Sequence, residues 1–113
     1  MKTVTEILIE ARELISDPER WTQGVYARDA QGIFTDWDSP EAVSWCVTGA
    51  IAKVVRSVQE SKGDYNALVM SALDKLRCAI GHDGVTAFND AHNHAEVLAA
   101  FDKAIEASRN TVH

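Results

Sequence analysis

The stretch SPEAVSWCVTGAIAKVVRSV, residues 39–58, decides the fold that the sequence predicts. Ser39 followed by Pro40 is the preferred order for a helix N-cap and its first helical residue. Apolar side chains then recur at the helical spacing, and in the first half of the stretch the opposite side is apolar too. A helix that is apolar nearly all round is typical of the centre of a fold, so we expect other elements to surround it. The main stripe comprises Val43, Val47, Ala50, Ile51, Val54 and Val58, and the other side comprises Ala42, Trp45, Gly49 and Ala52.

A first helix is predicted upstream, over residues 4–16, because apolar residues recur there at the helical period. Thr3 and Glu6 have the spacing of a capping box, in which each side chain accepts a hydrogen bond from the other residue's backbone N–H. Asp17 should end the helix, since a residue that precedes a proline is disfavoured in the helical conformation.

Residues 21–37 lose the helical period and predict a small β-hairpin. Residues 25–28 and 33–35 flank the turn-forming tetrapeptide Asp29-Ala30-Gln31-Gly32. A two-stranded ribbon is only marginally stable alone in water, so we expect it to pack against the helices. The aromatic side chains available for this contact are Trp21, Tyr26, Phe34 and Trp37.

A third helix is predicted over residues 65–80. The tripeptide Lys62-Gly63-Asp64 should end the central helix and cap the next one, with glycine at the C-terminal cap and aspartate at the N-cap. A connection of this length places the two helices in an antiparallel hairpin.

The last part of the chain predicts a polar segment and a final helix. Residues 81–92 are polar, with one helical turn over residues 86–90 that carries Phe88 inward. Asn93 and Glu96 then have the spacing of a second capping box. The predicted fold is mainly α, a compact bundle of four principal helices with a small β-hairpin between helices one and two, in a single domain over residues 1–113.

Composition and charge exclude several classes of partner. The 113 residues are 46% hydrophobic and 25% charged, as in an ordinary globular domain. The net charge is −6, whereas proteins that bind nucleic acid through its phosphates are positively charged, so no nucleic-acid partner is expected. No apolar run reaches the length of a signal-peptide core or a membrane span, so we expect no membrane partner. Two cysteines fit a reducing compartment, and the predicted location is the cytoplasm.

Trp45 with Gly49 one turn later supports two interpretations. The missing side chain at Gly49 lets another backbone or ring approach the central helix, which is packing. Alternatively, Trp45 forms the floor of a small-ligand pocket with a few convergent polar groups at its rim. The residues proposed for that rim are Arg28, Asp29, Asn89 and Asp90.

The sequence Asp36-Trp37-Asp38, running into Glu41, is the densest acidic stretch and has an aromatic residue in its middle. One interpretation is favourable electrostatics at a helix N-terminus. The other is an interaction surface that presents carboxylates to a basic groove on a protein partner, where opposite charge speeds association.

Metal and thiol chemistry are weaker candidates. Imidazole and carboxylate groups gather in one segment, but His92 and His94 are two positions apart, which does not suit two ligands on one helix face. We therefore expect polar loop residues and predict no metal and no cofactor. Cys46 should be a small core residue, and Cys78 falls on the opposite side of its helix from the apolar stripe, which argues against a disulfide. The segment rich in imidazole and carboxylate groups contains His82, Asp83, Asp90, His92, His94 and Glu96.

Several spaced motifs occur together in the chain. They are Asp17-Pro18-Glu19-Arg20-Trp21-Thr22-Gln23-Gly24, then Ala27-Arg28-Asp29, Trp45-Cys46 with Gly49-Ala50, and Asn89-Asp90 ahead of His94-Ala95-Glu96-Val97. In this order the motifs resemble an uncharacterised family of short bacterial and phage-encoded proteins, a domain of unknown function. The resemblance covers nearly the whole chain and implies no activity, cofactor or partner. It adds a phage-related accessory or anti-defence role to the functions considered.

Two functional hypotheses follow. The first is a non-enzymatic cytoplasmic binding or interaction module whose partner is another protein, and it expects an exposed apolar patch near Trp37 or Trp21. The alternative is a small-molecule-binding protein or small enzyme, and it requires Arg28 and Asn89 to converge on one concavity that contains Trp45. The sequence does not define the oligomeric state.

Overall fold

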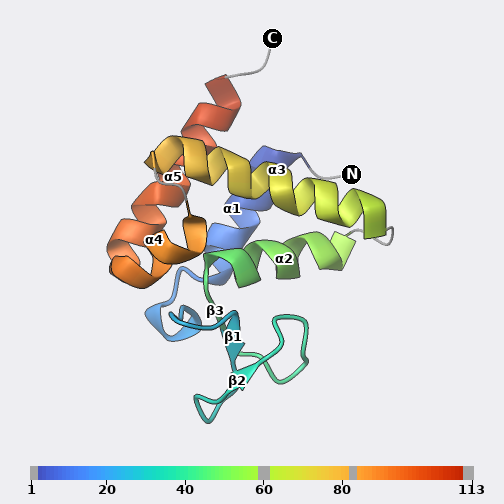
Figure 1. Cartoon of the computed structure of the whole chain (residues 1–113), viewed down its shortest axis with the longest axis vertical. Coiled ribbons are helices and arrows are strands. Elements are labelled where there is room, and N and C mark those ends of the chain that lie inside the picture. Colours follow the sequence, from blue (N-terminus) through green and yellow to red (C-terminus); the bar gives the residue numbers. More distant parts are fainter. Residues whose placement is uncertain (1–2, 59–61, 82–83, 111–113) are drawn as a thin grey trace.

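A computed structural model describes residues 3–58, 62–81 and 84–110, apart from the side chains of residues 58, 62–64 and 110. Within these ranges the chain forms five α-helices, one 3₁₀ turn (η1) and a small three-stranded antiparallel sheet (Figure 1). The prediction of a mainly α fold is confirmed, and the prediction of four principal helices with a two-stranded hairpin is corrected. The elements are α1 Val4–Leu14, η1 Pro18–Arg20, β1 Ala27–Arg28, β2 Phe34–Thr35, β3 Ser44–Trp45, α2 Val47–Val58, α3 Lys62–Ile80, α4 Val85–Ala91 and α5 His94–Asn110.

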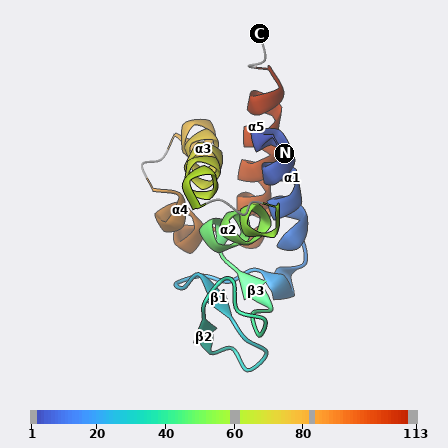
Figure 2. The same cartoon turned by 90° about the vertical axis from the view of Figure 1, so that its right-hand side faces the viewer.

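The helices pack around α2 and α5. Helix α1 lies against α2 and α5, and α3 lies alongside α2 and also contacts α5. The sheet lies outside this helical body, beyond the N-terminal end of α2 (Figures 1 and 2). The buried core therefore sits between the helices, and its largest completely buried side chains include Phe101, Ile7, Leu8 and Ile51.

The central helix is shorter than predicted, because α2 begins at Val47 and not at Ser39. Ser39 caps only an isolated turn, in which its hydroxyl accepts a hydrogen bond from the backbone N–H of Glu41. Ser44 and Trp45 are extended and pair with β1, with Trp45 opposite Ala27. Non-local strand pairing has thus overridden a local helix signal, as tertiary context often does.

The boundary between the second and third helices also differs from the prediction. Helix α3 begins at Lys62, so Gly63 and Asp64 are inside the helix and do not form the predicted pair of caps. The connection from α2 falls at residues 59–61, which lie outside the described residues. The two helices nevertheless run antiparallel, as predicted (Figure 1).

Both predicted capping boxes are present. The hydroxyl of Thr3 accepts from the N–H of Glu6, whose carboxylate accepts from the N–H of Thr3, and α1 follows. Asn93 and Glu96 make the same reciprocal pair ahead of α5. Such boxes are recognisable from sequence because both partners lie within one turn of the helix start.

The predicted hairpin corresponds to β1 and β2, to which β3 adds a strand in the order β2-β1-β3. Asp29 stabilises the tight turn, where its Oδ1 accepts from the N–H groups of Gln31 and Ile33, and Gly32 adopts a positive φ of 79°. Trp21 and Trp37 pack against the core as expected. Tyr26 and Phe34 do not, since 53% and 65% of their surfaces are exposed.

The polar segment before the last helix forms a longer helix than the single turn that the sequence predicts. Helix α4 spans Val85–Ala91, and Phe88 within it is half-buried against the core. The ring of Phe88 stacks on that of His92, with 3.9 Å between ring centroids. His82 and Asp83 lie outside the described residues.

Candidate functional site

Asn89 is the most connected of the candidate residues. Its side chain is completely buried, and its Oδ1 accepts from Trp21 Nε1 at 2.8 Å and from the backbone N–H of Val47 at 3.1 Å. Its Nδ2 donates to the carbonyl of Thr22 at 3.0 Å and to Asp90 Oδ1 at 3.1 Å. All the hydrogen-bonding capacity of the amide is used. Asn89 therefore joins the loop after η1 to the first residue of α2.

The loop after η1, residues 22–24, makes further contacts with the end of α4. Gln23 Nε2 lies 2.9 to 3.2 Å from the backbone carbonyls of Asn89, Asp90 and His92 and donates to them. Asp90 Oδ1 in turn accepts from the N–H of Gly24 at 2.9 Å. The final carbonyls of a helix lack partners within it, so Gln23 serves as a cap supplied from a distant segment.

Arg28 ties the same loop to the hairpin turn. Its Nε donates to Thr22 Oγ1 at 2.8 Å, and its two terminal nitrogens donate to the carbonyls of Gly32 and Gln23 at 3.0 and 3.2 Å. Arg28 and Asn89 thus meet at Thr22, one at the hydroxyl and the other at the carbonyl. The structure brings Arg28, Asn89 and Asp90 around one loop, whereas Asp29 is occupied within its own turn.

Trp45 and Gly49 form a close packing contact, which favours the first of the two interpretations given above. Trp45 is only 6% exposed and donates from Nε1 to the carbonyl of Trp37 at 3.0 Å. A Cβ at Gly49 would lie 2.2 Å from the carbonyl oxygen of Tyr26. Glycine is required here because the backbone of the sheet approaches α2 directly.

Trp37 is held between the sheet and the helices. Its ring stacks on Tyr65 of α3, with 5.8 Å between centroids and 15° between planes. Burial raises the pKa of the Tyr65 hydroxyl, and the nearby positive charge of Arg56 partly offsets this shift. Asp36, next to Trp37 in the sequence, is exposed. The aromatic residue of the acidic stretch therefore anchors it, and the carboxylates face solvent.

The segment that projects from the helical body, residues 24–43, is here called the sheet lobe (Figure 2). It carries one basic and four acidic side chains, a net charge of −3, out of −6 for the chain. Four of the five exposed large hydrophobic side chains in the described residues belong to it. They are Tyr26, Ile33, Phe34 and Val43, and the fifth is Met70 on α3.

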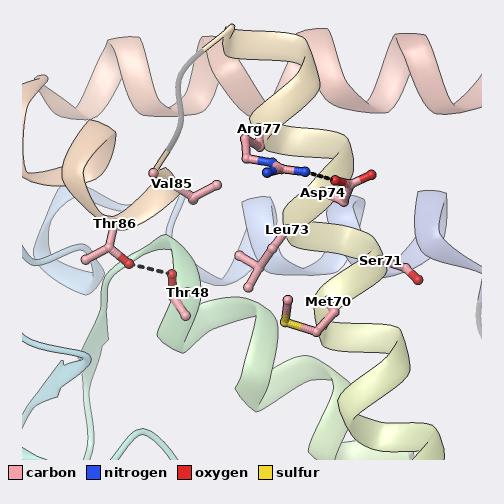
Figure 3. Close-up of a pocket in the computed structure, with 9 residues that line it drawn as sticks. Thr48, Met70, Ser71, Leu73, Asp74, Arg77, Val85 and Thr86 are labelled. Carbon is pink, nitrogen blue, oxygen red and sulfur yellow. Dashed lines mark hydrogen bonds and ion pairs between the residues drawn. The ribbon is translucent and has the colours of Figure 1, made fainter.

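An open groove of about 610 Å³ lies between α3, α4 and the start of α2 (Figure 3). At one end Arg77 forms an ion pair with Asp74, and on the opposite wall the hydroxyls of Thr48 and Thr86 are 3.0 Å apart. Met70 lies toward the other end. None of the candidate site residues Arg28, Asp29, Trp37, Trp45, Asn89 and Asp90 lines this groove or a smaller cavity of about 230 Å³ beside Gly24 and Tyr26.

The two cysteines differ in burial. Cys46 is buried and Cys78 is exposed, and neither forms a disulfide. Burial raises the pKa of the Cys46 thiol, whose sulfur accepts a hydrogen bond from the N–H of Gly49.

A ring nitrogen of His94 lies 2.7 Å from the carbonyl of Ile15, and one of His92 lies 2.9 Å from the carbonyl of Phe88. Among the described residues, no group of three histidine, cysteine or carboxylate side chains is arranged to hold a metal ion.

Sequence reasoning identified Arg28, Asn89 and Asp90 but not Thr22, Gln23 or the exposed side chains of the sheet lobe. Thr22 and Gln23 lie within the motif Trp21-Thr22-Gln23-Gly24, and this motif is the signal that the sequence offers for them. Their roles depend on α4, more than 60 positions away, and could not be assigned from local pattern.

The fold and this arrangement define a class of small, mainly helical protein with a projecting acidic sheet. Residues 1–107 match the model of a family of unknown function, DUF6197, and the chain belongs to that family. The chain matches no curated protein and no solved structure. In the part of the chain that the structure describes, every helix is too short or too polar to cross a lipid bilayer.

Proposed function

We propose that the protein is a non-enzymatic, cytoplasmic protein-interaction module that contacts its partner through the sheet lobe. The observation that carries this proposal is the gathering of four exposed large apolar side chains on one projecting segment of the chain. Single exposed apolar residues are ordinary on protein surfaces, but a concentration of them marks an interaction site.

The charge of the lobe indicates what kind of partner it fits. Asp36, Asp38 and Glu41 are exposed, so a partner that contacts the lobe would meet carboxylates as well as apolar side chains. A partner surface that combines basic and apolar groups matches this composition, and opposite charge would speed the encounter. The resemblance to phage-encoded proteins suggests a host protein as that partner and a phage-related accessory or anti-defence role.

The sequence hypothesis expected the exposed patch near Trp37 or Trp21. Both rings are half-buried, and their neighbours in the lobe carry the exposed surface instead. Trp37 contributes by fixing the lobe on α3 through its stacking with Tyr65. The tryptophans therefore support the surface and do not form its centre.

A small-molecule site over Trp45 is less well supported. Arg28 and Asn89 direct their donors to backbone carbonyls and to Thr22, which supports structural roles for them. A ligand that recruited them would have to break these internal hydrogen bonds. The interaction module is therefore the function that the geometry supports best.

Site-specific photo-crosslinking tests the proposal. The photoreactive residue p-benzoylphenylalanine is placed at Phe34 or, as a matched control, at Met70, because both side chains are 65% exposed but lie on different faces. We expect a crosslinked partner protein from position 34 in host cells and none from position 70. Absence of a crosslink from position 34, or equal crosslinking from both positions, would overturn the assignment of the function to the sheet lobe.

A further inference from the structure

The sheet has one occupied edge and one open edge. At the edge formed by β3, Trp45 forms a parallel bridge with Trp21, and the N–H of Thr22 donates to the carbonyl of Trp45 at 3.1 Å. At the other edge, no strand of the described residues lies beside β2. Figures 1 and 2 show β2 as the strand farthest from the helices. The open edge is thus presented to solvent at the tip of the molecule.

The backbone of Phe34 points toward this open side. Asp29 donates from its N–H to the carbonyl of Ile33 at 2.9 Å, whereas the N–H of Ile33 donates to the side chain of Asp29, so only one of the two ladder bonds between these residues is made. That bond flanks the register pair of Arg28 with Phe34, which is the pattern around a non-hydrogen-bonded pair. In agreement, the carbonyl of Arg28 accepts from Val43 on the β3 side. The N–H and C=O of Phe34 are therefore available to an added strand.

The side chains at this edge suit the same use. Ile33 and Phe34 are 62% and 65% exposed. Phe34 begins β2 and Ile33 directly precedes it, so a strand added beside β2 would meet both apolar side chains. Backbone hydrogen bonds would supply affinity and these side chains specificity, as in other complexes formed by strand addition.

Charge selects the occupant of the edge. Asp36 and Asp38 follow β2 and are exposed, and the lobe as a whole has a net charge of −3. A second copy of this chain would bring an equal negative charge to the same edge, and charged side chains at an edge are a common means of preventing self-pairing. A basic segment would instead be attracted by the negative charge of this edge.

From these observations we infer that β2 receives an extended, lysine- or arginine-rich segment of the partner protein as an additional strand, paired through the backbone of Phe34. This inference rests on the proposed function and specifies how the sheet lobe would bind. The partner segment would be unfolded or at a free strand edge before binding, since its own backbone groups must be unpaired.

The test uses a short peptide that alternates lysine and valine, titrated into the isotope-labelled full-length protein and followed by NMR. Two control peptides accompany it. One replaces every lysine by glutamate, and the other keeps the charges but carries N-methyl groups on alternate residues, which removes the donors on one edge. We expect binding of the lysine peptide with protection of the Phe34 amide from exchange, about tenfold weaker binding of the N-methylated peptide, and none of the glutamate peptide.

A pair of variants separates strand addition from side-chain contact. Phe34→Ala removes the ring, and Phe34→Pro removes both the ring and the outward N–H. Because that N–H makes no bond within the sheet, proline at this edge position costs no ladder hydrogen bond. We expect Phe34→Pro to weaken peptide binding by about a further tenfold relative to Phe34→Ala. Circular dichroism checks that both variants retain the fold.

The outcomes distinguish this inference from the proposed function. Equal binding by the two variants, equal binding of the N-methylated peptide, or no binding of the lysine peptide would overturn strand addition. The proposed function would survive those results if a partner still crosslinks from position 34. Failure of the crosslinking experiment would overturn the proposed function whatever the peptides do.

Discussion

Trp21 and Asn89, 68 positions apart in the sequence, are joined by a hydrogen bond of 2.8 Å from the indole Nε1 to the side-chain oxygen. The same oxygen accepts from the first N–H of α2, at Val47. A single buried amide thereby fixes the chain after η1, the short helix α4 and the start of α2. The position of the sheet lobe depends on this junction, because the loop that leads into the lobe begins at Thr22.

Removal of the Asn89 amide should destabilise the protein. Asn89→Ala leaves the indole N–H of Trp21, the N–H of Val47 and the carbonyl of Thr22 without their partner, and unsatisfied buried groups of this kind are costly. We expect the free energy of unfolding in urea to fall by about 2 to 4 kcal/mol. Asn66→Ala is the control, because Asn66 is exposed on α3. A loss at Asn89 no larger than at Asn66 would contradict the structural role.

Arg28 provides a test between a structural and a ligand-binding role. Arg28→Ala removes three donors that hold residues 22 and 23 and the hairpin turn. We expect a loss of about 1 to 2 kcal/mol in stability, together with faster amide exchange in β1 and β2, because the lobe loses its attachment. Arg28→Lys should behave similarly, since one ammonium cannot reproduce the planar fork. Unchanged stability and unchanged exchange would favour a ligand-binding role instead.

The parts of the fold that sequence predicted well depend on neighbouring residues. Both capping boxes lie within one helical turn, and the turn at Asp29 is stabilised by the aspartate's own side chain. Strand β3 was missed because Trp45 pairs with Ala27, a contact that local pattern does not encode. Without that pairing, the apolar run ahead of Val47 fits a helix equally well.

The candidate site, too, is only partly predictable from the sequence. Arg28 and Asn89 were selected as polar residues near Trp45, and the structure does bring them to a common residue, Thr22. Whether a side chain presents its hydrogen bonds to a ligand or uses them internally depends on the loop conformation, which sequence alone does not define. The exposure of Phe34 was also unpredictable, because an apolar strand residue is expected to face the core.

Gly49→Ala should lower stability although alanine favours helices. In an open helical position the substitution would raise stability by about 1 kcal/mol. Here the new methyl group would lie 2.2 Å from the carbonyl of Tyr26, so the sheet must move away from α2. We expect a net loss of about 1 to 3 kcal/mol in chemical denaturation. Gly84→Ala is the control, because its added Cβ would meet Ala87 at an ordinary 3.5 Å and should change stability by no more than about 1 kcal/mol.

The buried thiol of Cys46 should make stability fall at alkaline pH. Burial raises its pKa above the ordinary value of 9.0, so above that pH the unfolded chain loses the thiol proton before the folded chain does. The unfolded state then binds fewer protons, and the free energy of unfolding decreases with pH by up to about 1.4 kcal/mol per pH unit for this group. Well below pH 9 both states keep the thiol proton, and the contribution is constant.

Unfolding free energies measured in urea at several pH values between 7 and about 10.5 test this dependence. Cys46→Ala should show a shallower alkaline fall than the wild type, and Cys78→Ala should follow the wild type because Cys78 is exposed. Some fall will remain in Cys46→Ala, since burial also raises the pKa of Tyr65. Equal slopes for wild type and Cys46→Ala would show that water reaches the thiol and that the contact between the sheet and α2 is looser than the structure indicates.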